Sequence, residues 1–163
     1  MIEQPSAAQD VETVKRVLVV DDYEEIRQLL KLMLESEGYQ VATVADGMAA
    51  VEFLTRAQDT WIVLLDVMMP DLDGLEVCAH LRAAGPAVTR HRVALMTASG
   101  LAVKECPAPA RTLLYKPFDI DTVQAVIGML ERDQTERDAR LSNPMNRLQA
   151  GDTPATTLRV ETG

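Results

Sequence analysis

The sequence contains few cysteines and no long hydrophobic run. Its two cysteines, Cys78 and Cys106, fit no metal-ligand spacing, so we expect both to be reduced thiols without a chemical role. No apolar stretch approaches the roughly 20 residues that span a bilayer, which argues against a membrane protein. The N-terminal residues lack the basic start and apolar stretch of a secretory signal. A cytoplasmic location is therefore expected.

Basic residues are also scarce. The chain of 163 residues has 16 Lys and Arg against 25 Asp and Glu, a formal net charge of -9. A nucleic-acid partner is therefore not expected, because such partners require a basic surface. The length and a hydrophobic fraction of 47% suffice for one domain whose core needs no metal or disulfide.

Short apolar segments alternate with segments of helical periodicity. The expected strands are 17–20, 39–44, 61–65, 93–96 and 112–115, and apolar positions recur at helical spacing within 24–34, 49–54, 75–81 and 123–130. Apolar strands joined by helical crossovers favour a parallel sheet that is covered by helices on both faces. The sequence therefore predicts an α/β fold with a doubly wound, five-stranded parallel sheet.

Polar side chains follow four of the expected strands: Asp21 and Asp22, Asp66, Thr97 and Lys116. In such sheets, ligands bind at the carboxyl edge, where these residues would meet. Close carboxylates would repel one another by several kcal/mol per pair, at an effective dielectric constant of about 20. Lys116 and a hard divalent cation such as Mg²⁺ could supply the opposing charge.

The chain from about residue 16 to residue 130 resembles the response-regulator receiver domain of two-component signalling. The motifs that carry the resemblance are V-L-V-V-D-D at 17–22, L-L-D-V-M-M-P-D-L-D-G at 64–74, M-T-A at 96–98 and K-P-F at 116–118. The resemblance implies a flavodoxin-like (βα)5 fold and a role as a signalling phosphoacceptor rather than as an enzyme with a separate substrate.

The resemblance also implies roles for individual residues. Asp66 would accept a phosphoryl group from the phosphohistidine of a sensor histidine kinase or a histidine phosphotransfer protein. Lys116 would pair with the transferred oxygens, and Thr97 would donate a hydrogen bond to the acyl phosphate. Mg²⁺ would be held by carboxylates and one backbone carbonyl: Asp21, Asp22, Asp66 and Met68.

Two departures from the family pattern affect the expected switch region. Leu113 occupies the position, three residues before the lysine, where the family commonly has an aromatic residue; Tyr115 lies on the same side of the strand and could replace it. Pro107 and Pro109 stand where the family has its fourth helix. Because proline within a helix costs about 3 kcal/mol, we expect that helix to be reduced or displaced.

The domain boundaries follow from these patterns. We expect a flexible leader at 1–15, a receiver domain at 16–132, and at 133–163 an extension of the last helix followed by a disordered tail. No output domain is expected, so the protein would be a stand-alone receiver, monomeric or homodimeric, that switches a contact with a downstream protein.

Two other functions remain possible at this stage. An adaptor with a receiver fold would bind its partner regardless of phosphorylation, which Leu113 and the proline-rich stretch favour slightly. A phosphohydrolase would need an acid or base two residues after Asp66, and Met68 cannot serve as one.

Other polar residues are expected to have no chemical role. Asp71 and Asp73, just before Gly74, are expected to be turn residues, and His80 and His91 are expected on the surface.

Overall fold

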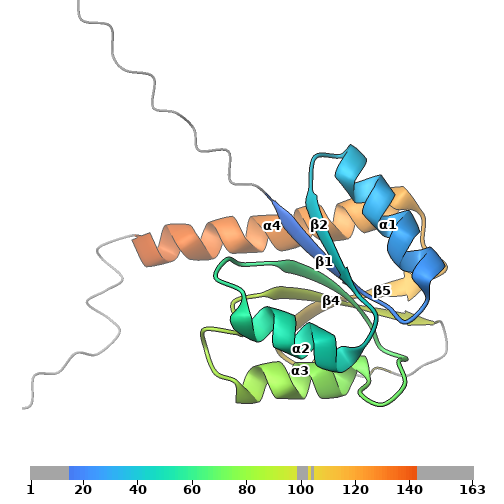
Figure 1. Cartoon of the computed structure of the whole chain (residues 1–163). Coiled ribbons are helices and arrows are strands. Elements are labelled where there is room, and N and C mark those ends of the chain that lie inside the picture. Colours follow the sequence, from blue (N-terminus) through green and yellow to red (C-terminus); the bar gives the residue numbers. More distant parts are fainter. Residues whose placement is uncertain (1–14, 99–102, 104, 143–163) are drawn as a thin grey trace, which may run out of the picture.

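The computed structural model describes residues 15–98, 103 and 105–142. Within them, five parallel strands form one sheet in the order β2-β1-β3-β4-β5 (Figure 1). The strands are β1 (Arg16–Val20), β2 (Gln40–Val44), β3 (Ile62–Asp66), β4 (Arg92–Ala98) and β5 (Ala110–Lys116). This order is that of flavodoxin-like folds, so the predicted fold class is confirmed.

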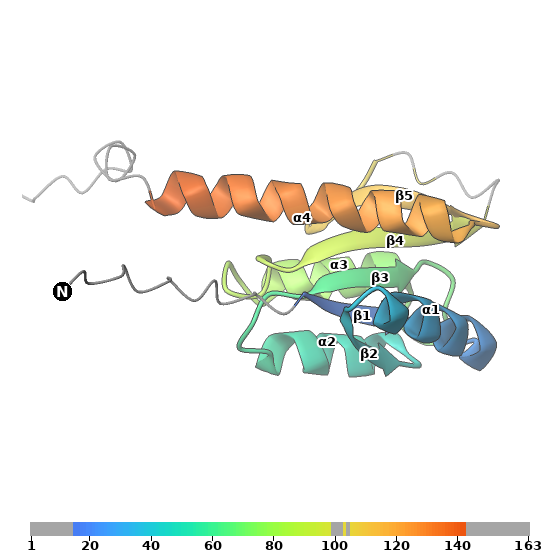
Figure 2. The ribbon, with the colours of Figure 1, turned by 90° about the horizontal axis from the view of Figure 1, so that it is seen from above.

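The described residues form four helices, which cover both faces of the sheet. They are α1 (Glu24–Ser36), α2 (Gly47–Arg56), α3 (Gly74–Ala83) and α4 (Ile120–Ser142). Figures 1 and 2 show α1 and α4 on one face and α2 and α3 on the other. No helix in the described ranges combines the length and apolar character that crossing a membrane requires.

Two hydrophobic cores follow from the alternation of side chains along the strands. Val17, Val19 and Leu64 face α1 and α4, where Leu30 and Ile127 pack against them. The alternate strand residues face α2 and α3: Leu18, Val20, Val63, Leu65, Val93 and Leu95. The central strands are thus buried on both sides, which holds their carboxyl ends in fixed positions.

Three helices begin at aspartates that cap them. Asp46, Asp73 and Asp119 each accept a hydrogen bond from the backbone N–H three residues on, and Glu76 completes a capping box with Asp73. The N-cap of α1 is Tyr23, whose side chain makes no capping hydrogen bond. The start of α1 must therefore be held in another way.

The connection between β4 and β5 departs from strict strand-helix alternation. Its described residues, 103 and 105–109, include no helical residue, in agreement with the predicted reduction of a helix here. The peptide bonds preceding Pro109 and Pro117 are cis. Val103 and Cys106 are partly buried against the core under α2 and α3, and Cys106 and buried Cys78 are both free thiols.

The last helix, α4, is tied to the opposite, amino edge of the sheet. Glu131 accepts hydrogen bonds from Lys15 Nζ and Tyr39 Oη, both at 2.9 Å. Arg92 Nη1 lies 3.5 Å from a carboxylate oxygen of Asp133. Figures 1 and 2 show α4 continuing past the strands at this edge. The expected leader, apart from Lys15, and the tail beyond Ser142 lie outside the described residues.

The expectation of a surface position was wrong for His91. This side chain is fully buried, with the Trp61 N–H donating to Nδ1 at 3.1 Å and Nε2 3.0 Å from the Leu54 carbonyl oxygen. Burial lowers its pKa, although the bond to the Leu54 carbonyl opposes that effect. His91 thus links three backbone segments as a neutral imidazole, whereas His80 is exposed as expected.

Candidate functional site

Three carboxylates meet at the carboxyl edge of the sheet. Asp66 is the last residue of β3, and Asp21 and Asp22 directly follow the buried strand β1. One oxygen from each lies within 4.8 Å of the others. Asp21 and Asp66 are buried, whereas Asp22 is exposed. The structure thus brings together the three acids that were predicted from the strand ends.

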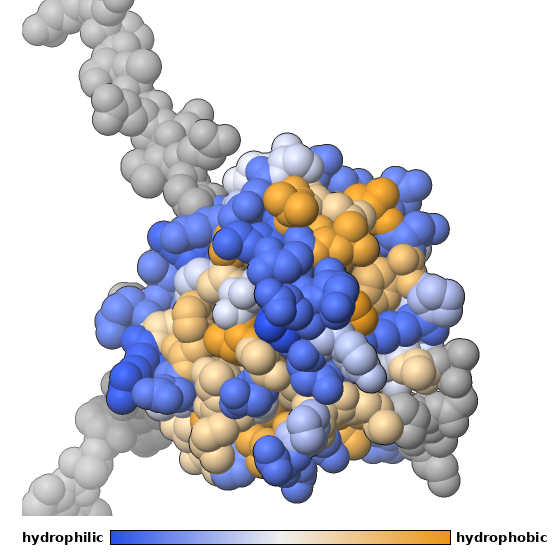
Figure 3. Space-filling model, turned by 45° about the vertical axis from the view of Figure 1, so that its right-hand side comes forward, coloured by the Kyte–Doolittle hydropathy of each residue, from blue (hydrophilic) through white to orange (hydrophobic). Residues whose placement is uncertain are grey.

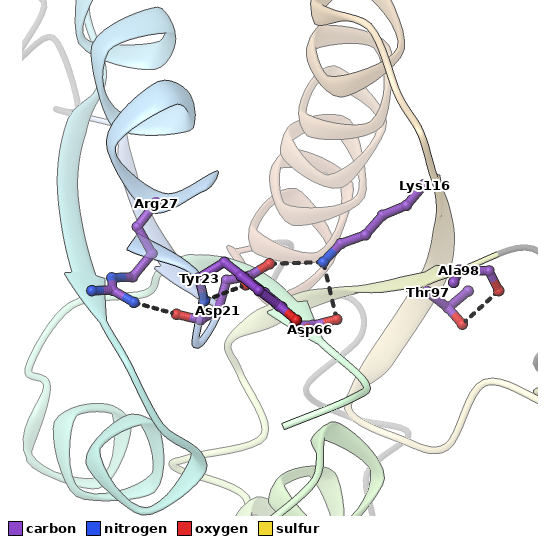
Figure 4. Close-up of polar contacts among 7 residues, drawn as sticks. All are labelled: Asp21, Tyr23, Arg27, Asp66, Thr97, Ala98 and Lys116. Atoms are coloured by element: carbon purple, nitrogen blue, oxygen red, sulfur yellow. Dashed lines mark hydrogen bonds and ion pairs between the residues drawn. The ribbon is translucent and has the colours of Figure 1, made fainter. Parts of the chain in front are cut away.

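Lys116, the last residue of β5, joins two of these acids. Its ammonium lies 2.8 Å from Asp21 Oδ2 and 3.3 Å from Asp66 Oδ1. Figure 4 shows both contacts as dashed lines. Burial works to lower the pKa of Lys116, but the hydrogen bonds to and negative charges of Asp21 and Asp66 prevail and raise it. Lys116 is therefore a fixed positive charge between the carboxylates.

The environment of Asp66 makes its ionisation costly. Its pKa is raised, first by burial and second by the charge of Asp21, while Lys116 and the backbone N–H of Met68 act in the opposite direction. Burial and the charge of Asp21 thus outweigh the single ammonium that contacts Asp66. An oxygen-seeking divalent cation fits the site, because the ligands are carboxylates and the surplus charge is negative.

Asp21 is held by two contacts that the sequence did not reveal. The backbone N–H of Tyr23 donates to its Oδ1 at 2.9 Å, and Arg27 Nη1 donates to its backbone carbonyl at 2.7 Å (Figure 4). With Lys116 on Oδ2, both carboxylate oxygens of Asp21 have donors. The only signal in the sequence was a basic residue in the second turn of the helix after the acids.

Gly74 has a steric role that sequence reasoning assigned only to a turn. A Cβ at this position would lie 2.5 Å from the backbone oxygen of Asp66 and 2.9 Å from Val67 Cα. The Gly74 N–H also donates to the Val67 carbonyl at 2.9 Å. The start of α3 thus packs directly on the backbone of Asp66. Within the same loop Asp71 has a positive φ of 67°, and Asp73 is the N-cap of α3.

Thr97 lies at the same sheet edge but outside the network of charges. It is fully buried, and its hydroxyl donates to the Ala98 carbonyl at 3.3 Å. Figure 4 shows it turned away from Asp66. Its neighbour on β5 is Tyr115, which is 54% exposed, whereas Leu113 is partly buried against the core.

The surface around α1 is partly apolar. Tyr23, Leu29 and Leu32 are more than half exposed, with exposed fractions of 61%, 56% and 67%. Figure 3 shows apolar side chains gathered over α1, next to a hydrophilic central region. Met68, in the loop after Asp66, is also exposed. Exposed Tyr23 and Met68 therefore lie next to the buried acids, since their backbone N–H groups donate to Asp21 and Asp66.

A sequence model of the response regulator receiver domain matches residues 17–128. The chain belongs to this family. The matched range contains the five described strands, except for the first residue of β1, and the whole edge cluster, so the predicted family membership is confirmed. This receiver domain is accordingly a signalling module of the two-component type.

Curated relatives of the receiver domain are response regulators. The response regulator MprA of Mycobacterium leprae (strain TN) is 37% identical over 131 residues, which cover 80% of this chain and 57% of the relative. MprA of Mycobacterium tuberculosis (strain ATCC 25618 / H37Rv) is 35% identical over 130 residues, covering 80% and 56%. The chain thus spans little more than half the length of these relatives.

Solved receiver structures share the fold. Full-length FixJ from B. japonicum is 29% identical with a TM-score of 0.68, covering 77% of this chain and 62% of FixJ. The receiver domain of sensor histidine kinase PA1611 from Pseudomonas aeruginosa PAO1 is 29% identical with a TM-score of 0.64, covering 71% and 96%. That structure has a magnesium ion coordinated in its active-site cleft.

Proposed function

We propose that this receiver domain accepts a phosphoryl group on Asp66 from the phosphohistidine of a sensor histidine kinase or a histidine phosphotransfer protein. The observation that carries the proposal is the cluster of Asp21, Asp22 and Asp66 around Lys116 at the carboxyl edge of the sheet. Phosphoryl transfer depends mainly on positioning and charge neutralisation, both of which this cluster provides.

The chemical step exchanges one bond to phosphorus for another. A carboxylate oxygen of Asp66 attacks the phosphorus, a P–O bond forms, and the P–N bond to the donor histidine breaks, leaving the electron pair on the imidazole. Lys116 neutralises the transferred oxygens from its position 3.3 Å from Asp66. The hydroxyl of Thr97 then turns from the Ala98 carbonyl to donate to the acyl phosphate.

Mg²⁺ would be held by Asp21 and Asp22, directly or through water, by Asp66 and by the backbone carbonyl of Met68. When bound, it supplies positive charge to the oxygens of the phosphoryl group. Asp21 already has a donor on each carboxylate oxygen, which favours contact through water. Exposed Asp22 has more freedom to bind the ion directly.

The proposed donor and the downstream partner are proteins that meet this domain in the cytoplasm. The exposed side chains of Leu29 and Leu32 offer apolar contact area along α1, the helix that follows Asp21 and Asp22, as helical partners require. Phosphorylation adds about 1.5 to 2 negative charges at Asp66, which would shift a two-state surface and so change the downstream contact.

The direct test uses a small phosphodonor such as acetyl phosphate with Mg²⁺. Intact-protein mass spectrometry should show one added phosphoryl group on the wild type and none on Asp66→Asn. Removing Mg²⁺ with a chelator should abolish the addition. Asp71→Asn is the matched control, because this acid of the same loop should leave the labelling unchanged. Equal labelling of wild type and Asp66→Asn would contradict the proposal.

A phosphorylation-independent adaptor is the second candidate function. It is favoured by Leu113, which is partly buried in the core where the family has an aromatic switch residue, and by the non-helical described residues before β5. An adaptor would bind its partner equally with and without Mg²⁺ and a phosphate mimic such as beryllofluoride. A change in partner affinity under those conditions would favour the switching function instead.

A further inference from the structure

We infer that Arg27 is a positioning residue for the cation site, acting through the backbone of Asp21; the inference rests on the proposed function. Arg27 lies in the second turn of α1, and its Nη1 is 2.7 Å from the Asp21 carbonyl oxygen. Among the described residues, the Arg27 guanidinium donates to this carbonyl and to no carboxylate oxygen. Its effect must therefore come from restraining the turn that carries Asp21 and Asp22.

The turn between β1 and α1 needs such a restraint for two reasons. First, the N-cap of α1, Tyr23, makes no side-chain capping hydrogen bond, whereas aspartates cap the other three described helices. Second, Asp21 and Asp22 are held near Asp66, within 4.8 Å, although their charges repel one another. Without a restraint, the turn would relax outward and separate the carboxylates.

Arg27 closes a compact ring of hydrogen bonds around this turn. The Arg27 N–H donates to the Tyr23 carbonyl at 3.2 Å, the Tyr23 N–H donates to Asp21 Oδ1 at 2.9 Å, and the Arg27 guanidinium returns to the Asp21 carbonyl. Figure 4 shows Arg27 and Lys116 on opposite sides of Asp21. Asp21 is thus held from the helix through its backbone and from β5 through its side chain.

Positioning and simple electrostatics predict opposite effects when Arg27 is replaced. The guanidinium carries a positive charge close to a cation site, so its removal alone would strengthen cation binding. Loss of the bond to the Asp21 carbonyl would instead let the carboxylates spread and weaken binding. A charge-assisted hydrogen bond of this kind corresponds to about a tenfold change in affinity.

The test measures Mn²⁺ binding, because Mn²⁺ prefers the same oxygen ligands as Mg²⁺ and free Mn²⁺ is quantified by electron paramagnetic resonance. Arg27→Met keeps the aliphatic stem but removes charge and donors. We expect it to bind Mn²⁺ about tenfold more weakly than the wild type. Arg27→Lys, which retains the charge and N–H donors, should bind within about threefold. Arg56→Ala removes an equal charge from an exposed site on α2 and should not weaken binding.

The possible outcomes distinguish a failure of the positioning role of Arg27 from a failure of the proposed function. Equal or tighter Mn²⁺ binding by Arg27→Met would overturn the positioning role while leaving the proposed function intact. Failure of the wild type to bind Mn²⁺ would overturn both. Urea unfolding of each variant, measured in parallel, ensures that the dissociation constants refer to folded protein. A loss of stability with an unchanged dissociation constant would assign Arg27 a purely structural role and refute the inference.

Discussion

Asp66 combines burial with a charge that the rest of the chain must compensate. The carboxylate is almost completely buried, and Asp21 is a second buried acid beside it. Lys116 contacts both, yet the pKa of Asp66 remains raised, chiefly because of burial. The ionised Asp66 therefore lowers the stability of the folded domain, as is common at functional sites.

Asp66→Asn should stabilise the protein in the absence of divalent cations. Burial and Asp21 raise the pKa of Asp66 above 3.8, so its ionised form costs folded-state stability above the raised pKa and costs nothing below 3.8. We expect the free energy of unfolding of Asp66→Asn to exceed that of the wild type by roughly 1 kcal/mol at about pH 7. This difference should disappear near about pH 3. Urea unfolding at both pH values measures it. A variant less stable than the wild type at neutral pH would argue against this account.

Lys116→Ala should still be phosphorylated but should no longer change its partner binding in response. The variant loses the charge that faces the transferred oxygens, so we expect uptake from a small phosphodonor to slow by roughly 100-fold but to persist with Mg²⁺. The phosphorylation-dependent change in partner binding should disappear, because the link from β5 to Asp66 is gone. Lys31→Ala, on the surface of α1, is the control. Full switching by Lys116→Ala, measured as partner affinity, would refute this prediction.

At the scale of the elements, the starts of the helices determine the shape of the site. The first residue of α3, Gly74, packs against the Asp66 backbone, and the first residue of α2, Gly47, packs equally closely on Leu72. Side chains at these positions would collide with backbone oxygens, each 2.5 Å from the added Cβ. Two helix starts are thus fitted to the loop that follows β3.

Gly74→Ala should destabilise the domain and disturb the site together. Because the clashing atom is a backbone oxygen, relief requires a shift of the Asp66 loop, and we expect a loss of about 2 to 4 kcal/mol. Gly128→Ala in α4 is the matched control, since its Cβ would meet only Arg132 Nη1 at 3.6 Å. That change should stabilise the helix by about 0.5 to 1 kcal/mol. Thermal or urea unfolding of both variants, compared with the wild type, measures these changes in stability.

The alternation of strands and helices was predictable, whereas several side-chain contacts were not. Apolar runs such as Val17–Val20 and the acids that follow them are local patterns, so the fold and the cluster of Asp21, Asp22 and Asp66 could be predicted. The burial of His91 depends on backbone groups of Trp61 and Leu54, which are distant in sequence. Contacts between residues that are distant in sequence produce no periodic pattern in the local sequence.

Three features of the site could not be predicted from the sequence, because they depend on tertiary packing or on a side-chain rotamer. The bond from Arg27 to the Asp21 carbonyl and the contact of Gly74 with Asp66 appear only when elements pack. The direction of the Thr97 hydroxyl depends on its rotamer. The sequence identified which strand end carries Thr97 but not which acceptor its hydroxyl uses.

At the scale of the whole molecule, α4 spans the sheet from one edge to the other. It begins four residues after Lys116, at the edge that carries the acids, and is bound near the opposite edge through Glu131. The hydrogen bond from Tyr39 joins this helix to the start of β2. Burial, followed by the bond to Glu131, raises the pKa of Tyr39 to about 12.

Tyr39→Phe should remove a contribution to the free energy of unfolding that the wild type loses at alkaline pH. Since the folded pKa of Tyr39 is about 12 and the ordinary value is 10.0, its contribution is complete below pH 10 and is lost as the pH rises towards 12. We expect the free energy of unfolding of the wild type to exceed that of the variant by about 1 kcal/mol at neutral pH. This difference should shrink between pH 10 and pH 12. Denaturant unfolding from pH 8 to pH 12 tests it. A difference that does not change across the window would contradict the prediction.

The contacts of Lys116 also impose an order of events. Three carboxylate charges and the ammonium that contacts two of them sum to two negative charges within the cluster, which the Arg27 guanidinium on the Asp21 carbonyl offsets only in part. A phosphoryl donor is itself an anion, so it meets a repulsive site until that charge is cancelled. In kinetic terms, we expect the cation to bind before the phosphoryl donor. The apparent affinity for the donor should therefore rise as the Mg²⁺ concentration is raised.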